Sequence, residues 1–335
     1  MILAGDLGGT KTLLGLFERP STSLGTSGER RPRHLVSHSY PTQEFGSFAA
    51  ILDAFAGDAG RRLAVDAAAI GVAGPIVDQQ ARLTNIAWDV SADQVGRQLA
   101  TRRVALLNDL EAMANSVPVL EDGELVVLQR GEPNASGHAA GNAAVIAAGT
   151  GLGQAYLHRI NGRLRPVASE GGHADFAPRT DREFELARML RDRYGRAEVE
   201  QVLSGPGLVN IYHFTHPGRT CEAVSGLTPA KMPAAISEAA LSHRCPGCEE
   251  ALAMFVDAYG AEAGNLALRG VATAGVFVGG GIAPKILPAL QDGRFIAAFR
   301  AKQPMAELVS AMPVQVIVRE DAGLLGAALA AEQLL

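Results

Sequence analysis

The chain has 335 residues, a length that predicts two domains or one large fold built of two lobes. Hydrophobic residues make up 47% and charged residues 19%, which excludes the disordered, collagen-like and coiled-coil classes and predicts a globular protein. The 30 Lys and Arg against 35 Asp and Glu leave a formal net charge of −5 without a block of like charge, so we expect neither nucleic acid nor an anionic membrane as a partner.

Two stretches of the sequence indicate where in the cell the protein is expected and whether it spans a membrane. Met1–Asp6 carries no basic region ahead of an apolar core, so we expect no signal peptide and a cytoplasmic protein. The longest stretch without Asp, Glu, Lys or Arg is Pro133–His158, and its polar residues and glycines make it too polar to span a bilayer. We therefore expect no membrane segment.

Glycine-rich turns follow apolar runs at several places along the chain. Each apolar run predicts a strand, and the turn comes directly after it. The three pairs of strand and turn are Ile2–Ala4 with Gly5–Thr10, Ala143–Ala148 with Gly149–Gly153, and Val276–Val278 with Gly279–Gly281. This self-similarity indicates a duplicated lobe.

The remaining segments mix predicted strands and helices. Apolar runs predict further strands at Ala67–Val72, Val104–Leu107 and Val314–Val318. Apolar residues spaced at i, i+3 and i+4 predict helices over Asp181–Tyr194, Pro229–Ser242, Cys248–Leu268 and Gly323–Leu335. The fold class is therefore α/β, and Gly131–Asn142 is the best candidate for a surface loop.

The glycine turns present backbone N–H groups without side chains in the way, as a bound phosphate chain requires. They favour a nucleotide ligand, although a single glycine turn is more often only a tight hairpin. Two common fingerprints are excluded: Gly5–Thr12 lacks the Gly-Lys pair of a P-loop, and neither Gly5–Thr10 nor Gly149–Gly153 fits G-x-G-x-x-G. In the first turn, Thr10 and Lys11 can donate to phosphate oxygens.

Asp6 lies inside the first glycine turn. A carboxylate beside bound phosphate would repel it unless a cation lay between them, so we interpret Asp6 as a ligand of Mg²⁺, direct or through water. The structural alternative is an Asx-type turn.

Asp109 follows the apolar strand Val104–Leu107 and Asn108. An acid at the carboxyl end of a strand in an open α/β sheet faces the ligand crevice. Asp109 is therefore a candidate general base for the acceptor hydroxyl in a phosphoryl transfer. An N-cap for a helix beginning at Leu110 is an alternative of equal weight.

Glu170-Gly171-Gly172-His173 groups two hydrogen-bonding side chains around a Gly-Gly bend, next to Asp175. Convergent acids and histidines of this kind can bind a polyhydroxyl ligand. A metal site or a capped loop is the alternative.

The three cysteines, an odd number in a long chain, indicate a reducing compartment. Cys245-Pro-Gly-Cys248 has the spacing of half a zinc site or of a redox pair. However, no second C-x-x-C is present, and His243 lies outside the usual spacing. We therefore favour a structural turn between two helices over metal or redox chemistry.

In their order along the chain, from Ile2 to the last helix, the motifs resemble those of bacterial glucokinases. The motifs are Gly5-Asp6-Leu7-Gly8-Gly9-Thr10, Leu107-Asn108-Asp109, Gly149-Thr150-Gly151-Leu152-Gly153, Glu170-Gly171-Gly172-His173, Ser204-Gly205-Pro206-Gly207 and Gly279-Gly280-Gly281-Ile282. The resemblance implies an actin-like ATPase with two RNase H-like lobes and a cleft between them. It places a small lobe at 1–110, completed by 322–335, and a large lobe at 111–321. It also implies a homodimer that phosphorylates glucose to glucose 6-phosphate with ATP and Mg²⁺.

The same resemblance implies a role for each motif. Asp109 would deprotonate the 6-hydroxyl, and the sugar would be held by Asn85, Asn108, Asp109, Glu170, His173 and Glu200. The glycine turns would bind ATP through Gly5, Asp6, Leu7, Gly8, Gly9, Thr10, Lys11, Gly149, Thr150, Gly151, Gly279, Gly280 and Gly281. Asp6 would hold Mg²⁺ through water.

One residue departs from the glucokinase pattern. Many close glucokinases carry Asn where this chain has Lys11, and Gly-Gly-Thr-Lys is similar to the repressor/kinase sugar family. A kinase for another hexose, such as fructose or an N-acetylated hexosamine, is therefore the alternative. That family usually carries a zinc-binding cysteine cluster after its Glu-Gly-Gly-His, and no cysteine lies between His173 and Cys221. We therefore expect no structural zinc, and because the first turn begins at Gly5 we expect no DNA-binding domain before it.

Overall fold

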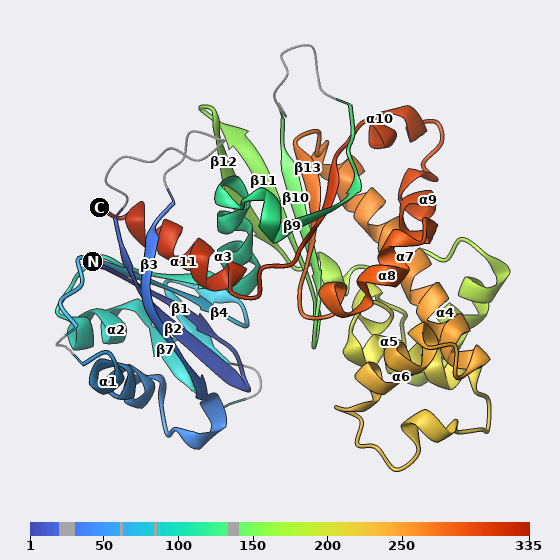
Figure 1. Cartoon of the computed structure of the whole chain (residues 1–335), viewed down its shortest axis with the longest axis horizontal. Coiled ribbons are helices and arrows are strands. Elements are labelled where there is room, and N and C mark those ends of the chain that lie inside the picture. The colour runs from blue at the N-terminus through green and yellow to red at the C-terminus, as the bar shows by residue number, and fades with distance from the viewer. Residues whose placement is uncertain (20–30, 61–62, 84–85, 87, 133–140) are drawn as a thin grey trace. The chain divides into compact units, whose positions relative to one another are not determined.

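The computed structural model describes residues 1–19, 31–60, 63–83, 86, 88–132 and 141–335. These residues form two compact units. Unit 1 consists of Met1–Glu121 and Arg319–Leu335, and unit 2 consists of Asp122–Val318 (Figure 1).

The sheet of unit 1 has the strand order β3-β2-β1-β4-β8. Its strands are β1 (Ile2–Leu7), β2 (Lys11–Glu18), β3 (Arg33–Pro41), β4 (Ala67–Val72) and β8 (Val104–Asn108). β1 pairs antiparallel with β2 and parallel with β4, and β4 pairs parallel with β8. The carboxyl ends of β1, β4 and β8 therefore share one edge, which is where Asp6 and Asp109 lie.

Helices cover both faces of this sheet, as continuous apolar strands such as β4 require. Helices α1 (Phe48–Asp58) and α2 (Ala92–Leu99) cover one face, and α3 (Asp109–Ser116) and α11 (Ala322–Glu332) cover the other (Figure 1). The smaller sheet of unit 1 contains β5 (Ile76–Val77), β6 (Gln80–Arg82) and β7 (Asp89–Ser91).

The packing of α3 on α11 places the boundary of unit 1 after Glu121, whereas the sequence placed it after residue 110. A Cβ atom at Gly326 of α11 would lie 1.7 Å from the carbonyl oxygen of Ala112 in α3. Only glycine allows the two helices to approach this closely, and α3 therefore belongs with the C-terminal helix.

The sheet of unit 2 has the strand order β12-β11-β10-β13-β14-β9. Its strands are β9 (Leu125–Gln129), β10 (Ala143–Ala148), β11 (Leu152–Ile160), β12 (Arg163–Ser169), β13 (Gly275–Gly279) and β14 (Val314–Ile317). In this spatial order, the five strands from β12 to β14 repeat the strand directions of the unit 1 sheet, with two antiparallel pairings followed by two parallel ones. The duplication predicted from the glycine turns is present in the topology.

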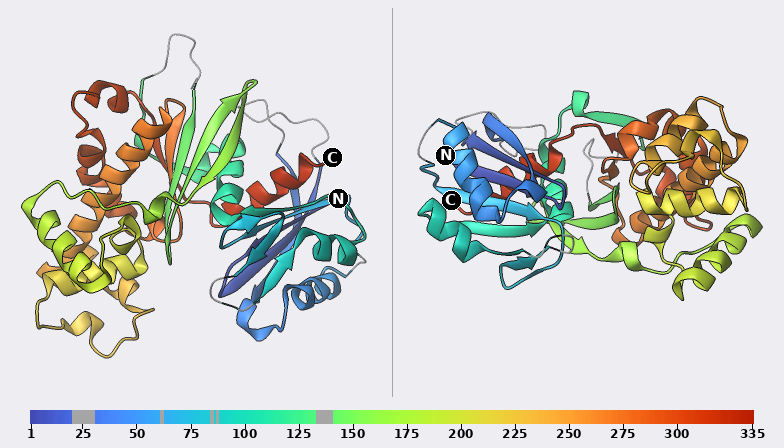
Figure 2. Two further views of the ribbon diagram at one scale, coloured as in Figure 1. Left: turned by 180° about the vertical axis from the view of Figure 1, so that it is seen from behind. Right: turned by 90° about the horizontal axis from the view of Figure 1, so that it is seen from below.

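The helices of unit 2 form a large core around α7 and gather to one side of its sheet (Figure 2). They are α4 (Asp181–Tyr194), α5 (Gly205–Thr215), α6 (Met232–Leu241), α7 (Pro246–Gly270), α8 (Leu287–Gln291), α9 (Arg294–Arg300) and α10 (Ala306–Ser310). Short 3₁₀ turns complete the chain at Thr42–Glu44, Val117–Val119, Asp122–Glu124, Gly171–His173, Val199–Gln201, Glu222–Val224 and Ala283–Ile286. Among the described residues, no helix is both long and apolar enough to cross a bilayer.

Candidate active site

The first glycine turn connects β1 to β2 and is held by Thr42, the first residue of the 3₁₀ turn that follows β3. The N–H of Gly8 donates to the carbonyl oxygen of Lys11 over 3.1 Å, which closes the turn. Thr42 then fastens it twice: its hydroxyl donates to the carbonyl of Gly8 over 2.8 Å, and its N–H donates to the carbonyl of Thr10 over 2.9 Å. The side chains of Thr10 and Lys11 are exposed and can reach a ligand. Thr42 was not predicted from the sequence.

Asp6 was predicted to lie inside the first glycine turn, but β1 continues through Leu7, so Asp6 lies in the strand, near its carboxyl end and beside the start of α11. A Cβ atom at Gly323, in the first turn of α11, would lie 3.2 Å from Oδ2 of Asp6. Burial raises the pKa of Asp6 to about 6; the negative charge of Asp109 adds to this effect, and the cation of Lys11 opposes it. The site therefore disfavours the ionised carboxylate in the absence of a cation.

Asn108, and not Asp109, is the N-cap residue of α3. Its Oδ1 accepts from the N–H of Leu110 over 3.0 Å, and its Nδ2 donates to the carbonyl of Gly74 over 3.3 Å. Asp109 is the first residue of the helix, and its Oδ1 also accepts from the N–H of Leu110, over 2.9 Å. Both residues therefore contribute to the helix start, and the carboxylate of Asp109 lies close enough to Asp6 to affect its pKa.

The second glycine turn, between β10 and β11, is held by Glu200. Oε2 of Glu200 accepts from the N–H of Leu152 over 2.8 Å, and a Cβ atom at Gly151 would lie 2.6 Å from the same oxygen. The N–H of Gly205, at the start of α5, donates to the carbonyl of Gly149 over 2.8 Å. The carboxylate of Glu200 therefore holds the second turn in place.

The third glycine turn follows β13 and packs against the end of β10. Gly280 has a φ of +83°, and a Cβ atom there would lie 2.4 Å from the carbonyl oxygen of Ala148. The buried hydroxyl of Tyr259 in α7 accepts from the N–H of Ala148 over 3.2 Å and lies 3.4 Å from the carbonyl of Gly279. This one side chain holds the ends of both strands together, and it was not predicted from the sequence.

Glu170 and His173 are both exposed at the end of β12. Nδ1 of His173 lies 3.4 Å from Oε2 of Glu198, and Arg196 donates to the carbonyl oxygen of His173. The N–H of Val199 donates to the carbonyl of Ala174 over 2.9 Å, which fastens the two short turns to each other. Glu198, which was not predicted from the sequence, orients the imidazole.

The predicted site residues divide between the two units. Unit 1 holds the residues of the first turn with Asn108 and Asp109, and unit 2 holds the second and third turns with Glu170, His173 and Glu200. Asn85, the remaining predicted sugar ligand, lies outside the described residues.

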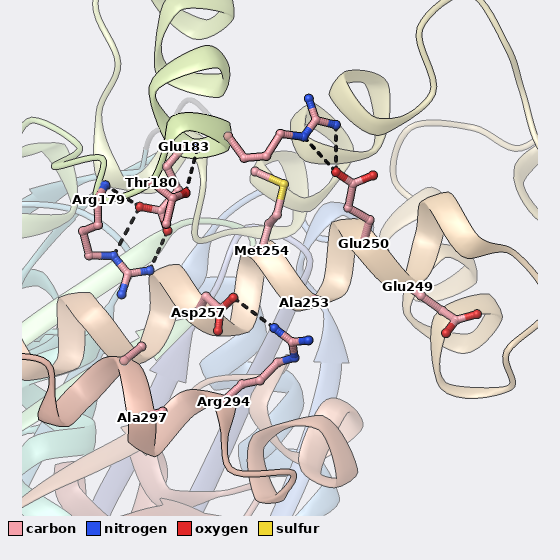
Figure 3. A pocket seen from close by; sticks show the side chains of 12 residues that line it. Arg179, Thr180, Glu183, Glu249, Glu250, Ala253, Met254, Asp257, Arg294 and Ala297 are labelled. Carbon is pink, nitrogen blue, oxygen red and sulfur yellow. Dashed lines mark hydrogen bonds and ion pairs between the residues drawn. The ribbon is translucent and has the colours of Figure 1, made fainter.

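A separate hollow of about 720 Å³ lies among α4, α7 and α9 (Figure 3). Six of its charged side chains form three ion pairs. The dashed lines in Figure 3 show Arg179 with Glu183 and Arg294 with Asp257, and Arg182 pairs with Glu250. Its lining residues include none of the predicted site residues. Because its charges are already matched, we assign it no part in the active site.

The prediction that Cys245 and Cys248 lack further metal ligands is wrong. The fold brings His216 and Cys221 to them, and one ligand atom from each of the four residues lies within 4.8 Å of the others. These two residues lie far from the Cys-x-x-Cys pair in the sequence, so the spacing rules used for zinc motifs did not reveal them.

Comparison with known proteins identifies the family of this chain. The family model described as Glucokinase matches residues 3–334. The glucokinase of Synechocystis sp. is 38% identical, over 99% of this chain and 98% of the relative. The crystal structure of a glucokinase from an Antarctic psychrotroph superposes with a TM-score of 0.82 at 30% identity, and covers 99% of this chain and 98% of that one.

A more distant structure is that of a glucokinase of the repressor/kinase sugar family (ROK) from Streptomyces griseus, in complex with glucose and AMPPNP. It has a TM-score of 0.64 and covers 99% of both chains. Because the identity is only 23%, this similarity bears on the fold alone. The predicted fold class, with two actin-like ATPase lobes, is confirmed by these neighbours. The resemblance found from the motifs is also confirmed, and the chain belongs to the glucokinase family.

Proposed function

We propose that this chain transfers the γ-phosphoryl group of ATP to the 6-hydroxyl of glucose, with Asp109 as the general base. The sugar oxygen forms a bond to the γ-phosphorus, the bond from that phosphorus to the oxygen of ADP breaks, and the hydroxyl proton passes to the carboxylate of Asp109. The observation that carries the proposal is the meeting of Asp6, Asp109 and the first glycine turn at one edge of the β1-β4-β8 sheet.

Asp6 suits a site for Mg²⁺, because its carboxylate is partly buried and its pKa is raised in the free protein. A cation held through water would offset the cost of ionising it. When bound, Mg²⁺ neutralises negative charge on the phosphates of the nucleotide. Thr10 and Lys11 offer further donors to the same phosphates.

We assign the sugar hydroxyls to Asn108, Glu170, His173 and Glu200, together with Asp109 and Asn85. In unit 2, the contact with Glu198 holds the imidazole of His173, and the N–H of Leu152 holds the carboxylate of Glu200. Side chains fixed in this way lose little rotamer entropy when a ligand binds. The second and third turns would receive the phosphates and the adenosine.

Lys11 favours one alternative, a kinase for another hexose, and a substrate panel separates the two functions. The purified chain is assayed with Mg²⁺ and either ATP or polyphosphate against glucose, fructose, mannose and N-acetylated hexosamines. We expect glucose with ATP to give the highest kcat/KM, with a kcat of ~1–100 s⁻¹. Clear turnover of another hexose without turnover of glucose would assign the chain to the alternative.

A further inference from the structure

A cluster of four metal-ligating side chains lies in unit 2, outside the proposed active site. His216 and Cys221 follow α5, and Cys245 and Cys248 lie at the start of α7. Their ligand atoms all lie within 4.8 Å of one another. Cys248 is fully buried, and the other three residues are partly buried.

The distances within the cluster fit a tetrahedral metal. Sγ of Cys221 lies 3.7 Å from Sγ of Cys248, and Nε2 of His216 lies 3.2 Å from Sγ of Cys245. A Zn–S bond of ~2.3 Å gives a sulfur-to-sulfur edge of ~3.8 Å in a regular tetrahedron. The same 3.7 Å is far longer than the ~2.05 Å of a disulfide bond, and all three cysteines are free.

The imidazole of His216 is oriented for this role. Its Nδ1 lies 3.1 Å from the carbonyl oxygen of Tyr212, to which an Nδ1–H group can donate. That hydrogen bond fixes the tautomer and leaves Nε2, the atom that faces Cys245, with a free lone pair. The ring also stacks on Tyr212, with centroids 4.1 Å apart.

The backbone around the cluster is shaped to admit the imidazole. A Cβ atom at Gly247, inside the Cys-x-x-Cys segment, would lie 2.5 Å from Cε1 of His216, so only glycine leaves room for the ring. The hydroxyl of Thr215 donates to the carbonyl of Gly247 over 2.8 Å. The N–H of Cys221 donates to the hydroxyl of Tyr212 over 2.9 Å. Each of the two ligand segments is therefore held next to the other by contacts that do not involve a metal.

We propose that His216, Cys221, Cys245 and Cys248 bind one structural Zn²⁺ ion. Three thiolates and one imidazole fill a tetrahedral shell and leave no position for a substrate, which is the pattern of a structural site. On binding, each thiol gives up its proton to solvent as its Zn–S bond forms, without oxidation or reduction.

The ion would fasten the C-terminal end of α5 to the start of α7. The other end of α5 begins at Gly205, whose N–H contacts the second glycine turn. Zinc would therefore stabilise unit 2 and support that turn from a distance. This inference is independent of the proposed reaction.

The first test is metal analysis of the full chain after gel filtration, with His216→Ala and Cys245→Ser as variants and His243→Ala as the matched control. His243 is exposed and pairs with Glu249, outside the cluster. We expect about one Zn²⁺ per chain in the wild type and the control, and a loss of about fivefold or more in each variant, accompanied by a lower Tm.

The second test needs no variant and therefore does not depend on whether the variants fold. The chain is produced in zinc-depleted medium and titrated with Co²⁺, whose tetrahedral thiolate complexes absorb strongly in the visible range. We expect one equivalent of Co²⁺ to produce these bands and to protect the three thiols from alkylation. A chain that contains no metal and gives no cobalt bands would overturn the proposal, as would a disulfide between Cys221 and Cys248 found by mass spectrometry.

Discussion

The partly buried carboxylate of Asp6 should lower the stability of the free protein at neutral pH. Burial, together with the charge of Asp109, raises the pKa of Asp6 from 3.8 to about 6. The folded state therefore binds this proton more tightly than the unfolded chain does. As a result, the free energy of unfolding falls as the pH rises through those two values, and it becomes level only above about pH 7.5.

The size of this effect follows from the two pKa values. A rise in the pKa from 3.8 to about 6 lowers the free energy of unfolding by ~3 kcal/mol between acidic and neutral pH. About 2 kcal/mol of this loss occurs between about pH 4.5 and about pH 7.5. Asp6→Asn removes the ionisation and keeps the size of the side chain. Between those pH values, we expect the stability of the variant to rise by ~2 kcal/mol relative to the wild type.

The assay is urea unfolding at a series of pH values, without metal or nucleotide. Asp89→Asn, which changes an exposed aspartate in β7 of the same unit, is the control and should follow the wild type. Because Asp6 is also the proposed Mg²⁺ site, the Asp6→Asn chain should lose kinase activity at the pH where its stability gains most. Identical pH profiles for the wild type and Asp6→Asn would refute the electrostatic reasoning.

Three further variants test the contacts that hold the glycine turns. Tyr259→Phe removes a buried hydroxyl and should lower the free energy of unfolding by ~1–3 kcal/mol, whereas Tyr194→Phe, which removes a part-exposed hydroxyl, should cost less; chemical denaturation measures both. Gly280→Ala should raise the KM for ATP, because the position combines a φ of +83° with a close backbone carbonyl. Gly57→Ala in α1, where a Cβ atom also meets nothing within 4 Å, should leave the KM for ATP unchanged in steady-state assays. Thr42→Val removes the side-chain hydrogen bond to the first turn and should raise the KM for ATP more than Thr42→Ser does. Equal KM values for the two variants would show that this hydrogen bond does not support ATP binding.

Local patterns in the sequence were sufficient to predict the strands and turns that carry the site. The apolar runs predicted β1, β10 and β13, although β1 continues to Leu7 and β13 to Gly279, so each of these two strands includes the first residues of its predicted turn. The helix Asp181–Tyr194 is confirmed to the residue, because Thr180 caps its start and Gly195, with a φ of +85°, ends it. These signals all lie within a few residues of the structure that they specify.

The residues that the sequence did not reveal act over long distances along the chain. Thr42 contacts the first turn from the 3₁₀ turn after β3, and Tyr259 contacts β10 from a position 111 residues later. His216 and Cys245 are 29 residues apart and meet only because the end of α5 packs beside the start of α7. A pattern of neighbouring residues contains no signal for such contacts, which depend on tertiary packing.

The most direct test of the proposed reaction compares kcat with glucose affinity in Asp109→Asn. If Asp109 accepts the proton of the 6-hydroxyl, its replacement should lower kcat by ~10²–10⁴-fold. The dissociation constant for glucose, measured by calorimetry on the same preparation, should change far less, because the proton moves only in the transition state. A variant that keeps the wild-type kcat and only unfolds at a lower temperature would show that Asp109 serves the start of α3 and not the reaction.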